Sequence, residues 1–232
     1  MITIRRSDDR GTANFGWLNS RHSFSFGHYF DQQHMGHGPL RVINEDKVKP
    51  GQGFDTHGHA DMEIISWVLE GSLEHKDSMG NGSIIKPGDM QRMTAGTGVR
   101  HSEFNASDQD DVHFLQIWVI PERQGLEPDY EQKNFGREEK LNQWRLVGSA
   151  DGREGSVRIN RDVDLYATVL EPGKQIHHEL GSGRKGWLQV ARGSVLVNGE
   201  RLEHGDGAAM DVPVSLTVEA IDDAEVLLFD MQ

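Results

Sequence analysis

The chain has 232 residues and a formal net charge of −13, from 24 Lys and Arg against 37 Asp and Glu. This negative balance argues against nucleic acid and anionic membranes as direct partners, because both bind cationic surfaces. The absence of cysteine excludes disulfides, thiolate nucleophiles and cysteine-based metal sites. Any transition-metal site must therefore use His, Asp and Glu.

The length is compatible with one large domain or two small ones. No stretch approaches the ~18 apolar residues of a membrane span. The N-terminal residues lack the apolar stretch of a signal peptide. The absence of cysteine fits a cytoplasmic protein, and we expect that location.

Short β-type runs lie between closely spaced Gly and Pro residues. The 27 Gly indicate many tight turns rather than long helices. Many of the runs alternate apolar and polar residues, which is typical of strands with one buried face. The expected strands are Leu40–Asn44, Met62–Leu69, Gly82–Ile85, Phe114–Ile120, Val157–Ile159, Leu165–Leu170, Trp187–Val190, Ser194–Val197, Ser215–Val218 and Glu225–Phe229. This succession predicts an all-β sandwich or barrel.

The segment of the chain most typical of a helix is Arg137–Trp144, and its length predicts one or two turns. This segment overlaps a polar stretch, Pro121–Lys140, that has no sustained apolar period. We interpret the stretch as the connection between two β units.

The two halves repeat the same order of turns. A Gly after a strand, an Asn-Gly pair and a Gly-Asp pair occur at Gly71, Asn81-Gly82 and Gly88-Asp89, and again at Gly193, Asn198-Gly199 and Gly205-Asp206. Asn-Gly pairs predict hairpin turns, because both residues tolerate positive φ. The alternative is a chance similarity of common turns, but the recurrence in order favours a tandem repeat of one small antiparallel barrel. Such a barrel can hold one ligand or ion in its interior.

The first half carries a His-x-His pair, His57 and His59, within the segment Gly51–Glu63. Residues two apart on a strand lie on one face, so both imidazoles can bind one cation. A second pair, His101 and Glu103, has the same spacing. If the two strands pair, three imidazoles and one carboxylate meet, a set that suits a divalent first-row metal with open positions.

These stretches resemble the two cupin motifs. Gly51-x5-His57-x-His59-x3-Glu63 is similar to the first motif, and Gly98-x2-His101-x3-Asn105 to the end of the second. There are two departures: seven residues rather than six separate Glu63 from Gly71, and Gly96 stands where the second motif usually has Pro.

The chain resembles the pirin family of bicupins more closely still, in its bacterial branch. The stretches that carry this resemblance are Gly16–Phe26, Leu40–Asn44, His57–Glu63, Asp77–Asn81 and Ala95–Glu103. It implies an all-β bicupin fold of two tandem antiparallel barrels (double-stranded β-helix, or jelly-roll) with short helical connections. We expect an N-terminal metal-binding barrel at residues 1–134 and a C-terminal barrel without a metal site at residues 135–232.

The resemblance also selects the fourth ligand, which the spacing alone leaves open between Glu63 and Glu103. In pirins this ligand is the Glu two residues after the His of the second motif. The implied metal ligands are therefore His57, His59, His101 and Glu103. Glu63 is then either an acceptor that orients an imidazole or a structural carboxylate.

The remaining histidines have simpler interpretations. In the second half, the adjacent residues His177 and His178 face opposite sides of a strand, so we expect ordinary polar residues there. We expect His75 and His113 to be buried and hydrogen-bonded. Four histidines of the N-terminal segment are expected in loops: His22, His28, His34 and His37.

Several aromatic residues lie near the metal motifs in the sequence. Phe24, Phe26, Tyr29 and Phe30 are expected in the core rather than around a substrate. Phe54 can either line the mouth of the site or pack in the core.

The resemblance implies quercetin 2,3-dioxygenase activity. A flavonol such as quercetin would bind the metal through its 3-hydroxyl group, react with dioxygen and lose carbon monoxide as its central ring opens. Glu103 is the expected catalytic base. The expected metal is Fe(II), with Zn, Mn, Co, Ni or Cu as alternatives in vitro. The expected partners are a small flavonol-like substrate and dioxygen, and a monomer is favoured.

Two other functions stay open. Pirins are also described as regulators. In this alternative the centre is a metal or redox sensor, and the protein acts by binding a regulatory or metabolic protein partner. A third hypothesis is a zinc-dependent cupin isomerase that acts on a sugar phosphate. Such an enzyme requires cationic residues around the cavity to bind the phosphate. The nearby Arg100 is expected to point away from the metal face, because it alternates with His101.

Overall fold

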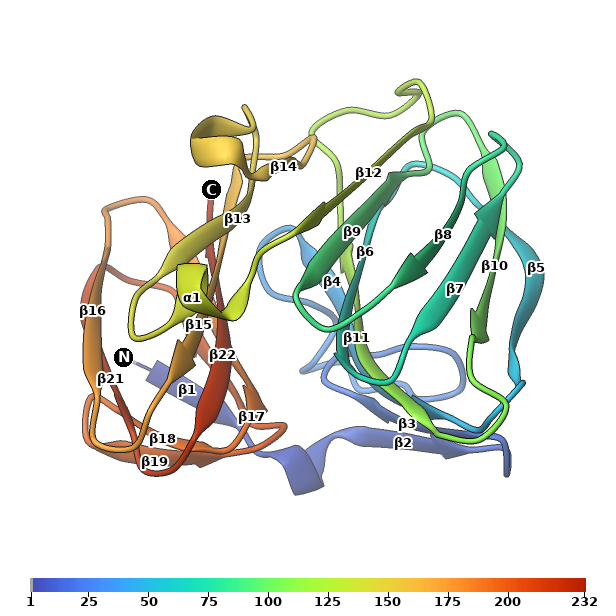
Figure 1. Ribbon diagram of the computed structural model, residues 1–232. Coiled ribbons are helices and arrows are strands. Elements are labelled where there is room, and N and C mark those ends of the chain that lie inside the picture. Colours follow the sequence, from blue (N-terminus) through green and yellow to red (C-terminus); the bar gives the residue numbers. More distant parts are fainter. Residues whose placement is uncertain (1) are drawn as a thin grey trace. The chain divides into compact units, whose positions relative to one another are not determined.

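The computed structural model describes residues 2–232 and is built almost entirely of antiparallel β-structure (Figure 1). The described residues pack as two compact units. Residues 11–134 and 157–161 form the N-terminal unit, and residues 2–10, 135–156 and 162–232 form the C-terminal unit. The division into domains at residues 134 and 135 stays a prediction.

Two sheets form the N-terminal unit. A seven-stranded sheet has the order β12-β9-β6-β11-β4-β3-β2, and a four-stranded sheet has the order β5-β10-β7-β8. Figure 1 shows them curving around a common interior. The strands are β2 (Gly11–Asn14), β3 (Leu18–His22), β4 (Leu40–Val48), β5 (Gly53–His59), β6 (Glu63–Glu70), β7 (Leu73–Asp77), β8 (Gly82–Ile85), β9 (Asp89–Thr94), β10 (Val99–Asn105), β11 (Val112–Val119) and β12 (Asp129–Asn134), with β14 (Val157–Arg158) from the later segment.

The C-terminal unit repeats this arrangement. One sheet contains the order β1-β20-β17-β22-β15-β13, and the other has the order β16-β21-β18-β19. The strands are β1 (Ile2–Arg5), β13 (Arg145–Ser149), β15 (Val163–Leu170), β16 (Gln175–Leu180), β17 (Lys185–Arg192), β18 (Ser194–Val197), β19 (Glu200–Glu203), β20 (Gly207–Met210), β21 (Val214–Ala220) and β22 (Ala224–Met231). The helical segments are short: η1 (Ser7–Asp9), α1 (Arg137–Lys140) and η2 (Arg153–Gly155).

The internal repeat is visible in the strand order. The order β9-β6-β11-β4 of one unit becomes β20-β17-β22-β15 in the other, and β5-β10-β7-β8 becomes β16-β21-β18-β19. Each of these eight strands thus corresponds to the strand eleven places later in the chain. The predicted all-β fold of two tandem barrels with short helical connections is confirmed.

Two local expectations were wrong. The polar stretch Pro121–Lys140 contains a strand, β12, which pairs with β9 at the edge of its sheet and whose residues are all at least partly exposed. An edge strand of this kind has no buried face, so it leaves no apolar alternation in the sequence. Asn81-Gly82 is not the centre of a hairpin turn, because the turn runs from Asp77 to Asn81 and the residue with positive φ is Gly80.

The interior of the N-terminal unit is apolar at two places. One cluster contains Phe114, Leu73 and Val48, and a second contains Ile64, Met93 and Val99. Burial of such side chains stabilises the fold by about 1.5–3 kcal/mol for each large residue. Phe54 packs against the first cluster and Trp118 against the second, and both rings line a cavity that His57 and Glu103 also line. No helix within residues 2–232 has the length and apolar character needed to cross a bilayer.

Candidate metal centre

A β-bulge decides which residues of β5 face the interior. β5 and β10 pair antiparallel with His57 opposite His101, and the register then shifts so that Phe54 lies opposite Glu103. The β5 strand therefore has one extra residue in this interval, which reverses the alternation of its side chains. Phe54, His57 and His59 consequently all line the same cavity.

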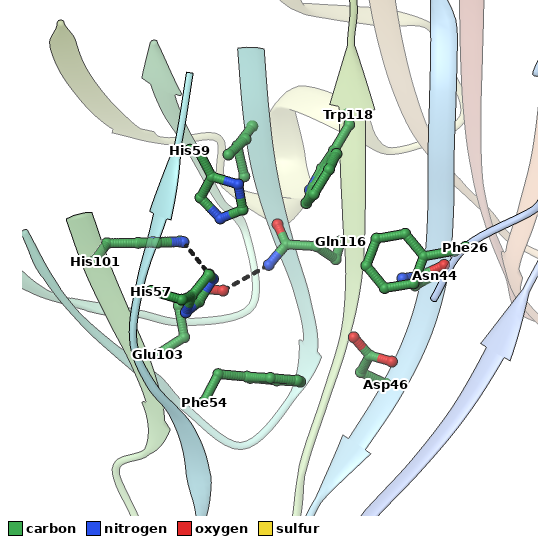
Figure 2. Close-up of a pocket in the computed structure, with 11 residues that line it drawn as sticks. Phe26, Asn44, Asp46, Phe54, His57, His59, His101, Glu103, Gln116 and Trp118 are labelled. Atoms are coloured by element: carbon green, nitrogen blue, oxygen red, sulfur yellow. Dashed lines mark hydrogen bonds between the residues drawn. The ribbon is translucent and has the colours of Figure 1, made fainter. Parts of the chain in front are cut away.

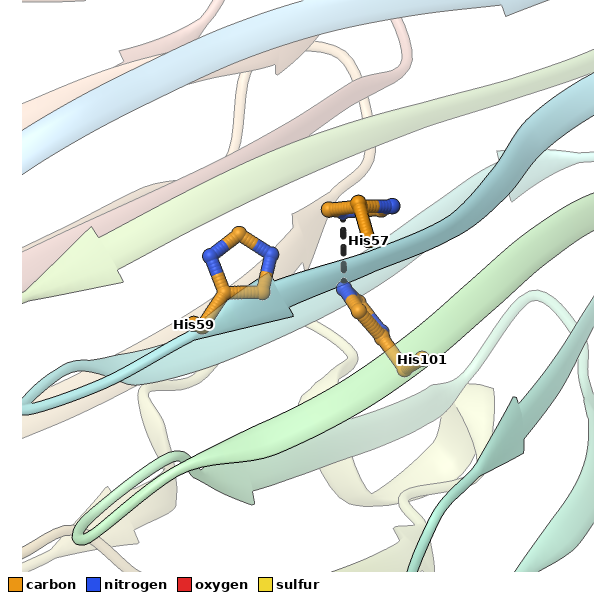
Figure 3. A group of neighbouring side chains, drawn as sticks. All are labelled: His57, His59 and His101. Carbon is orange, nitrogen blue, oxygen red and sulfur yellow. Dashed lines mark hydrogen bonds between the residues drawn. The ribbon is translucent and has the colours of Figure 1, made fainter.

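The three histidines meet as the two sequence pairs predicted (Figure 3). The Nε2 atoms of His57 and His101 lie 3.1 Å apart. The ring of His59 lies 4.7 Å from that of His57 and 4.9 Å from that of His101, measured between centroids. One nitrogen from each ring lies within 4.8 Å of the other two, so the three rings could share a single ion.

A hydrogen bond orients one of these rings, and burial favours the neutral form of the other two. His57 donates from Nδ1 to the carbonyl oxygen of Asp55 at 2.7 Å, which leaves the lone pair of the neutral ring on Nε2. Burial, reinforced by His57 and His75, lowers the pKa of His101 to about 3. Burial, reinforced by His101 and His57, lowers the pKa of His59 to about 4. Neutral imidazole is the form that binds a metal.

Glu103 is buried beside this group and is held by two donors. Ser66 donates to its Oε1 at 3.0 Å, and Gln116 donates to its Oε2 at 2.7 Å. Glu103 also belongs to a second group of potential ligands, with His75 and His101. A carboxylate has about four lone-pair directions, so these two bonds leave acceptor capacity toward the cavity.

His75 connects His101 to a carboxylate. The two Nδ1 atoms lie 3.5 Å apart, and His75 Nε2 lies 3.1 Å from Oδ2 of Asp77. Tyr130 stacks on the His75 ring with centroids 5.1 Å apart. His75 is therefore buried and hydrogen-bonded, as predicted, and it supports the ring of His101 from behind.

The cavity itself lies between the two sheets of the N-terminal unit and has a volume of about 60 Å³ (Figure 2). The four-stranded sheet contributes the histidines, Glu103 and Phe54. The seven-stranded sheet contributes Ile64, Gln116, Trp118, Asn44 and Asp46, and Phe26 completes the lining.

Glu63 lies away from this group. Its Oε2 accepts from the backbone N–H and the side chain of Asn160 at 3.0 and 3.3 Å, and Arg92 lies 4.0 Å from the same oxygen. Glu63 thus holds the segment 157–161 and has no imidazole among these partners, which matches the interpretation of a structural carboxylate.

Several other histidine expectations have clear outcomes. His113 is buried and lies 2.9 Å from Oε1 of Glu45, as predicted. His22 is not in a loop: it lies on β3 and is buried, with Nε2 at 2.8 Å from Oγ of Ser20. In the C-terminal unit His177 is exposed, whereas His178 lies on the other face of β16 and contacts Asp230 at 2.8 Å.

The sequence interpretation missed most residues on the far side of the cavity. Gln116 interrupts the apolar run of β11, and such an interruption in a buried strand could have indicated a functional residue. Phe26, expected in the core, lines the cavity and packs edge-on against Trp118 at 5.4 Å. Phe24 is buried as expected, but Phe30 is exposed. Arg100 points away, as predicted, and donates to the carbonyl oxygen of Thr56 at 3.2 Å.

The donor set fits a divalent transition metal. Three imidazoles converge from two paired strands, two of their nitrogens lie 3.1 Å apart, and the buried carboxyl group of Glu103 lies on the same wall of the cavity. In the metal-free chain the Nε2–H of His101 can donate to the lone pair on Nε2 of His57 at 3.1 Å, and a bound ion would take the place of that proton. Imidazole and carboxylate together are ligands for Fe, Ni, Cu and Zn.

Comparison with known proteins gives matches over the whole chain. A family model described as Pirin matches residues 4–119, and one described as Quercetinase C-terminal cupin domain matches residues 146–231. The quercetin 2,3-dioxygenase of Escherichia coli K12 is 45% identical over 231 residues, which cover 100% of this chain and 99% of that protein.

Two solved structures share the fold closely. The crystal structure of YhhW from Escherichia coli aligns with a TM-score of 0.95 and 45% identity, covering 100% of this chain and 98% of that one. The structure of the bacterial pirin YhhW in complex with nickel(II) aligns with a TM-score of 0.94, 45% identity and coverages of 100% and 99%. These matches confirm the resemblance found in the motifs: the chain is quercetin 2,3-dioxygenase-like over its full length and belongs to the pirin family.

Proposed function

We propose that this protein is a metal-dependent dioxygenase that opens the central ring of a flavonol such as quercetin with dioxygen and releases carbon monoxide. The observation that carries this proposal is the convergence of three histidines and Glu103 in one aromatic-lined cavity. The relative named quercetin 2,3-dioxygenase supports the reaction class. The nickel(II) complex of YhhW supports a divalent metal.

In this proposal His57, His59, His101 and Glu103 hold one divalent ion. A bound ion supplies a Lewis-acid centre for oxygen atoms of the substrate. We infer Fe(II) as the native metal, with Zn, Mn, Co, Ni or Cu able to occupy the site in vitro, because these metals all accept imidazole and carboxylate ligands.

Glu103 is also the proposed base. The 3-hydroxyl proton of the flavonol must leave before the ring can react, and a carboxylate at the wall of the cavity can accept it. Ser66 and Gln116 fix the orientation of this carboxylate through their hydrogen bonds. The carboxylate can therefore meet the hydroxyl group without first reorienting.

The aromatic residues would hold the planar substrate. Phe54, Phe26 and Trp118 line the cavity on different sides of its polar groups. Aromatic rings bind flat apolar surfaces by stacking or edge-on contact. Such contacts would also exclude water from the reacting atoms.

Elemental analysis of anaerobically purified protein, followed by oxygen-electrode assays with a panel of flavonols, tests the proposal. We expect stoichiometric metal, oxygen uptake and release of carbon monoxide, all lost in His57→Ala and Glu103→Ala. His177→Ala is the matched control, since this exposed histidine lies in the C-terminal unit. Metal-loaded protein that consumes no flavonol would contradict the enzyme proposal, and partner binding that follows the metal oxidation state would then favour the sensor. The cytoplasmic location and the monomeric state stay predictions.

A further inference from the structure

The cavity has a second polar group, on the sheet opposite the histidines. Asn44 and Asp46 lie two residues apart on β4, so both side chains point into the interior. In Figure 2 they lie across the cavity from His57 and Glu103, with Gln116 between the two groups. The proposed chemistry uses neither Asn44 nor Asp46.

Both residues carry a buried oxygen atom without a partner. Asn44 and Asp46 are 3% and 4% exposed, and neither Oδ1 atom has a hydrogen-bond partner. A buried polar atom left unpaired costs about 1–3 kcal/mol. Unpaired atoms of this kind at the wall of a cavity are explained when a ligand pairs with them.

The carboxyl group of Asp46 is held in place from the neighbouring strand. Ser20 lies opposite Asp46 on β3 and hydrogen-bonds to its side chain. Oγ of Ser20 lies in turn 2.8 Å from Nε2 of His22. The chain of contacts from His22 through Ser20 holds one side of the Asp46 carboxyl group. The Oδ1 atom of Asp46 stays available to a ligand in the cavity.

Burial raises the pKa of Asp46 to about 7; the hydrogen bond from Ser20 opposes this effect, and the charges of Glu103 and Glu45 add to it. Near neutral pH the group can therefore both donate and accept a hydrogen bond. A phenolic hydroxyl group, which also does both, is complementary to it.

We propose that Asp46, together with Asn44, binds a phenolic hydroxyl group on the part of the substrate remote from the metal ligands, and so selects polyhydroxylated aromatic substrates. The inference rests on the proposed function for the orientation of the substrate. The proposed substrate therefore carries oxygen atoms at both of its ends. One end faces the histidines, and the other faces β4. The aromatic residues between these ends contact its rings.

Anaerobic binding separates this inference from catalysis, because no turnover occurs without dioxygen. The probes are quercetin and 3-hydroxyflavone, which share the chelating oxygens, but only quercetin carries further hydroxyl groups. Binding to the metal-loaded protein is followed by quenching of tryptophan fluorescence. The variants are Asp46→Leu, which removes the hydrogen bond, and Asp46→Asn, which keeps a polar group of the same size. Lys47→Gln is the control, since Lys47 is exposed and is adjacent to Asp46 on β4.

We expect Asp46→Leu to weaken quercetin binding about tenfold, the equivalent of one buried hydrogen bond, and 3-hydroxyflavone binding less than about twofold. The affinity of Asp46→Asn for quercetin should lie between those of Asp46→Leu and the wild type. Lys47→Gln should leave the ratio of the two ligand affinities unchanged. Equal losses for both ligands, or no change for either, in a variant with a wild-type circular dichroism spectrum would overturn the inference. Oxygen uptake by the wild type is measured separately: its absence would refute the proposed dioxygenase, whereas the affinity ratio would still decide the role of Asp46.

Discussion

The Nδ1 atoms of His75 and His101 lie 3.5 Å apart, and His75 Nε2 lies 3.1 Å from Oδ2 of Asp77. When His101 uses Nε2 toward the cavity, its Nδ1–H can donate to His75, whose Nε2–H donates to Asp77. This row fixes the orientation and the tautomer of a proposed ligand through two residues that do not line the cavity.

We therefore expect His75→Ala to weaken metal binding by about 10–100-fold, the usual effect of losing a partner behind a ligand. Competition with a chromogenic chelator measures the affinity. His113→Ala is the control, because His113 is also buried but pairs with Glu45. Unchanged affinity in His75→Ala would show that His101 needs no support.

His101→Ala should lose bound metal and keep the fold. The apolar clusters around Phe114 and Ile64 do not contain His101, and they stabilise the N-terminal unit without an ion. Elemental analysis and scanning calorimetry of the same sample check both parts. A variant that is unfolded without metal would contradict the second part.

Gln116→Leu should lower kcat about tenfold with nearly full metal content. The substitution removes the 2.7 Å hydrogen bond to Oε2 of Glu103 and leaves the carboxylate held by Ser66 alone. Oxygen uptake at saturating flavonol, normalised to bound metal, measures the effect. Gln143→Leu, an exposed position in the C-terminal unit, is the matched control.

Asp46→Asn should stabilise the metal-free protein at alkaline pH. The pKa of Asp46 is about 7 in the folded chain, against about 3.9 for an unfolded aspartate. The folded state therefore binds more protons between these values, and the stability of the wild type falls as pH rises through this window. An asparagine does not titrate, so the free-energy advantage of the variant should grow by at least about 1 kcal/mol between pH 4 and pH 8.

Urea unfolding at both pH values measures this difference. Histidine titration affects variant and wild type alike and cancels in the comparison. Asp108→Asn, on an exposed turn, should change the difference by less than about 0.5 kcal/mol. A pH-independent difference for Asp46→Asn would mean that Asp46 titrates normally in the folded chain.

Gly53→Ala should disrupt the pairing that assembles the site. A Cβ atom at Gly53 would lie 2.3 Å from the carbonyl oxygen of Glu103 and 2.5 Å from Cα of Phe104. Overpacking of this kind costs about 1–3 kcal/mol, and here it pushes β5 away from β10. We expect a lower melting temperature and weaker metal binding. Gly82→Ala is the control, because its Cβ would have no atom closer than 4.0 Å.

Local patterns predicted much of the fold. The strands at Gly82–Ile85 and Ser194–Val197 have the bounds that the structure shows, and the turn at Asn198-Gly199 has positive φ at both residues. These features depend on neighbours within a few residues, so they are readable in the sequence. β12 was missed because an exposed edge strand carries no such pattern.

The candidate site likewise has features that are readable in the sequence and features that depend on tertiary structure. Residue types and spacings predicted that His57, His59 and His101 would meet, because strand alternation is a local property, whereas the choice of Glu103 over Glu63 came from the family resemblance. Which residues surround them depends on strand pairing over long sequence separations. The bulge in β5 brought Phe54 to the cavity, where alternation from His57 would have placed Asp55. The pairing of β11 and β4 placed Gln116 beside Glu103 and left Asp46 facing the cavity with an unpaired oxygen. The sequence thus determined the chemistry available at this site, and only the tertiary structure determined the partners that orient and use it.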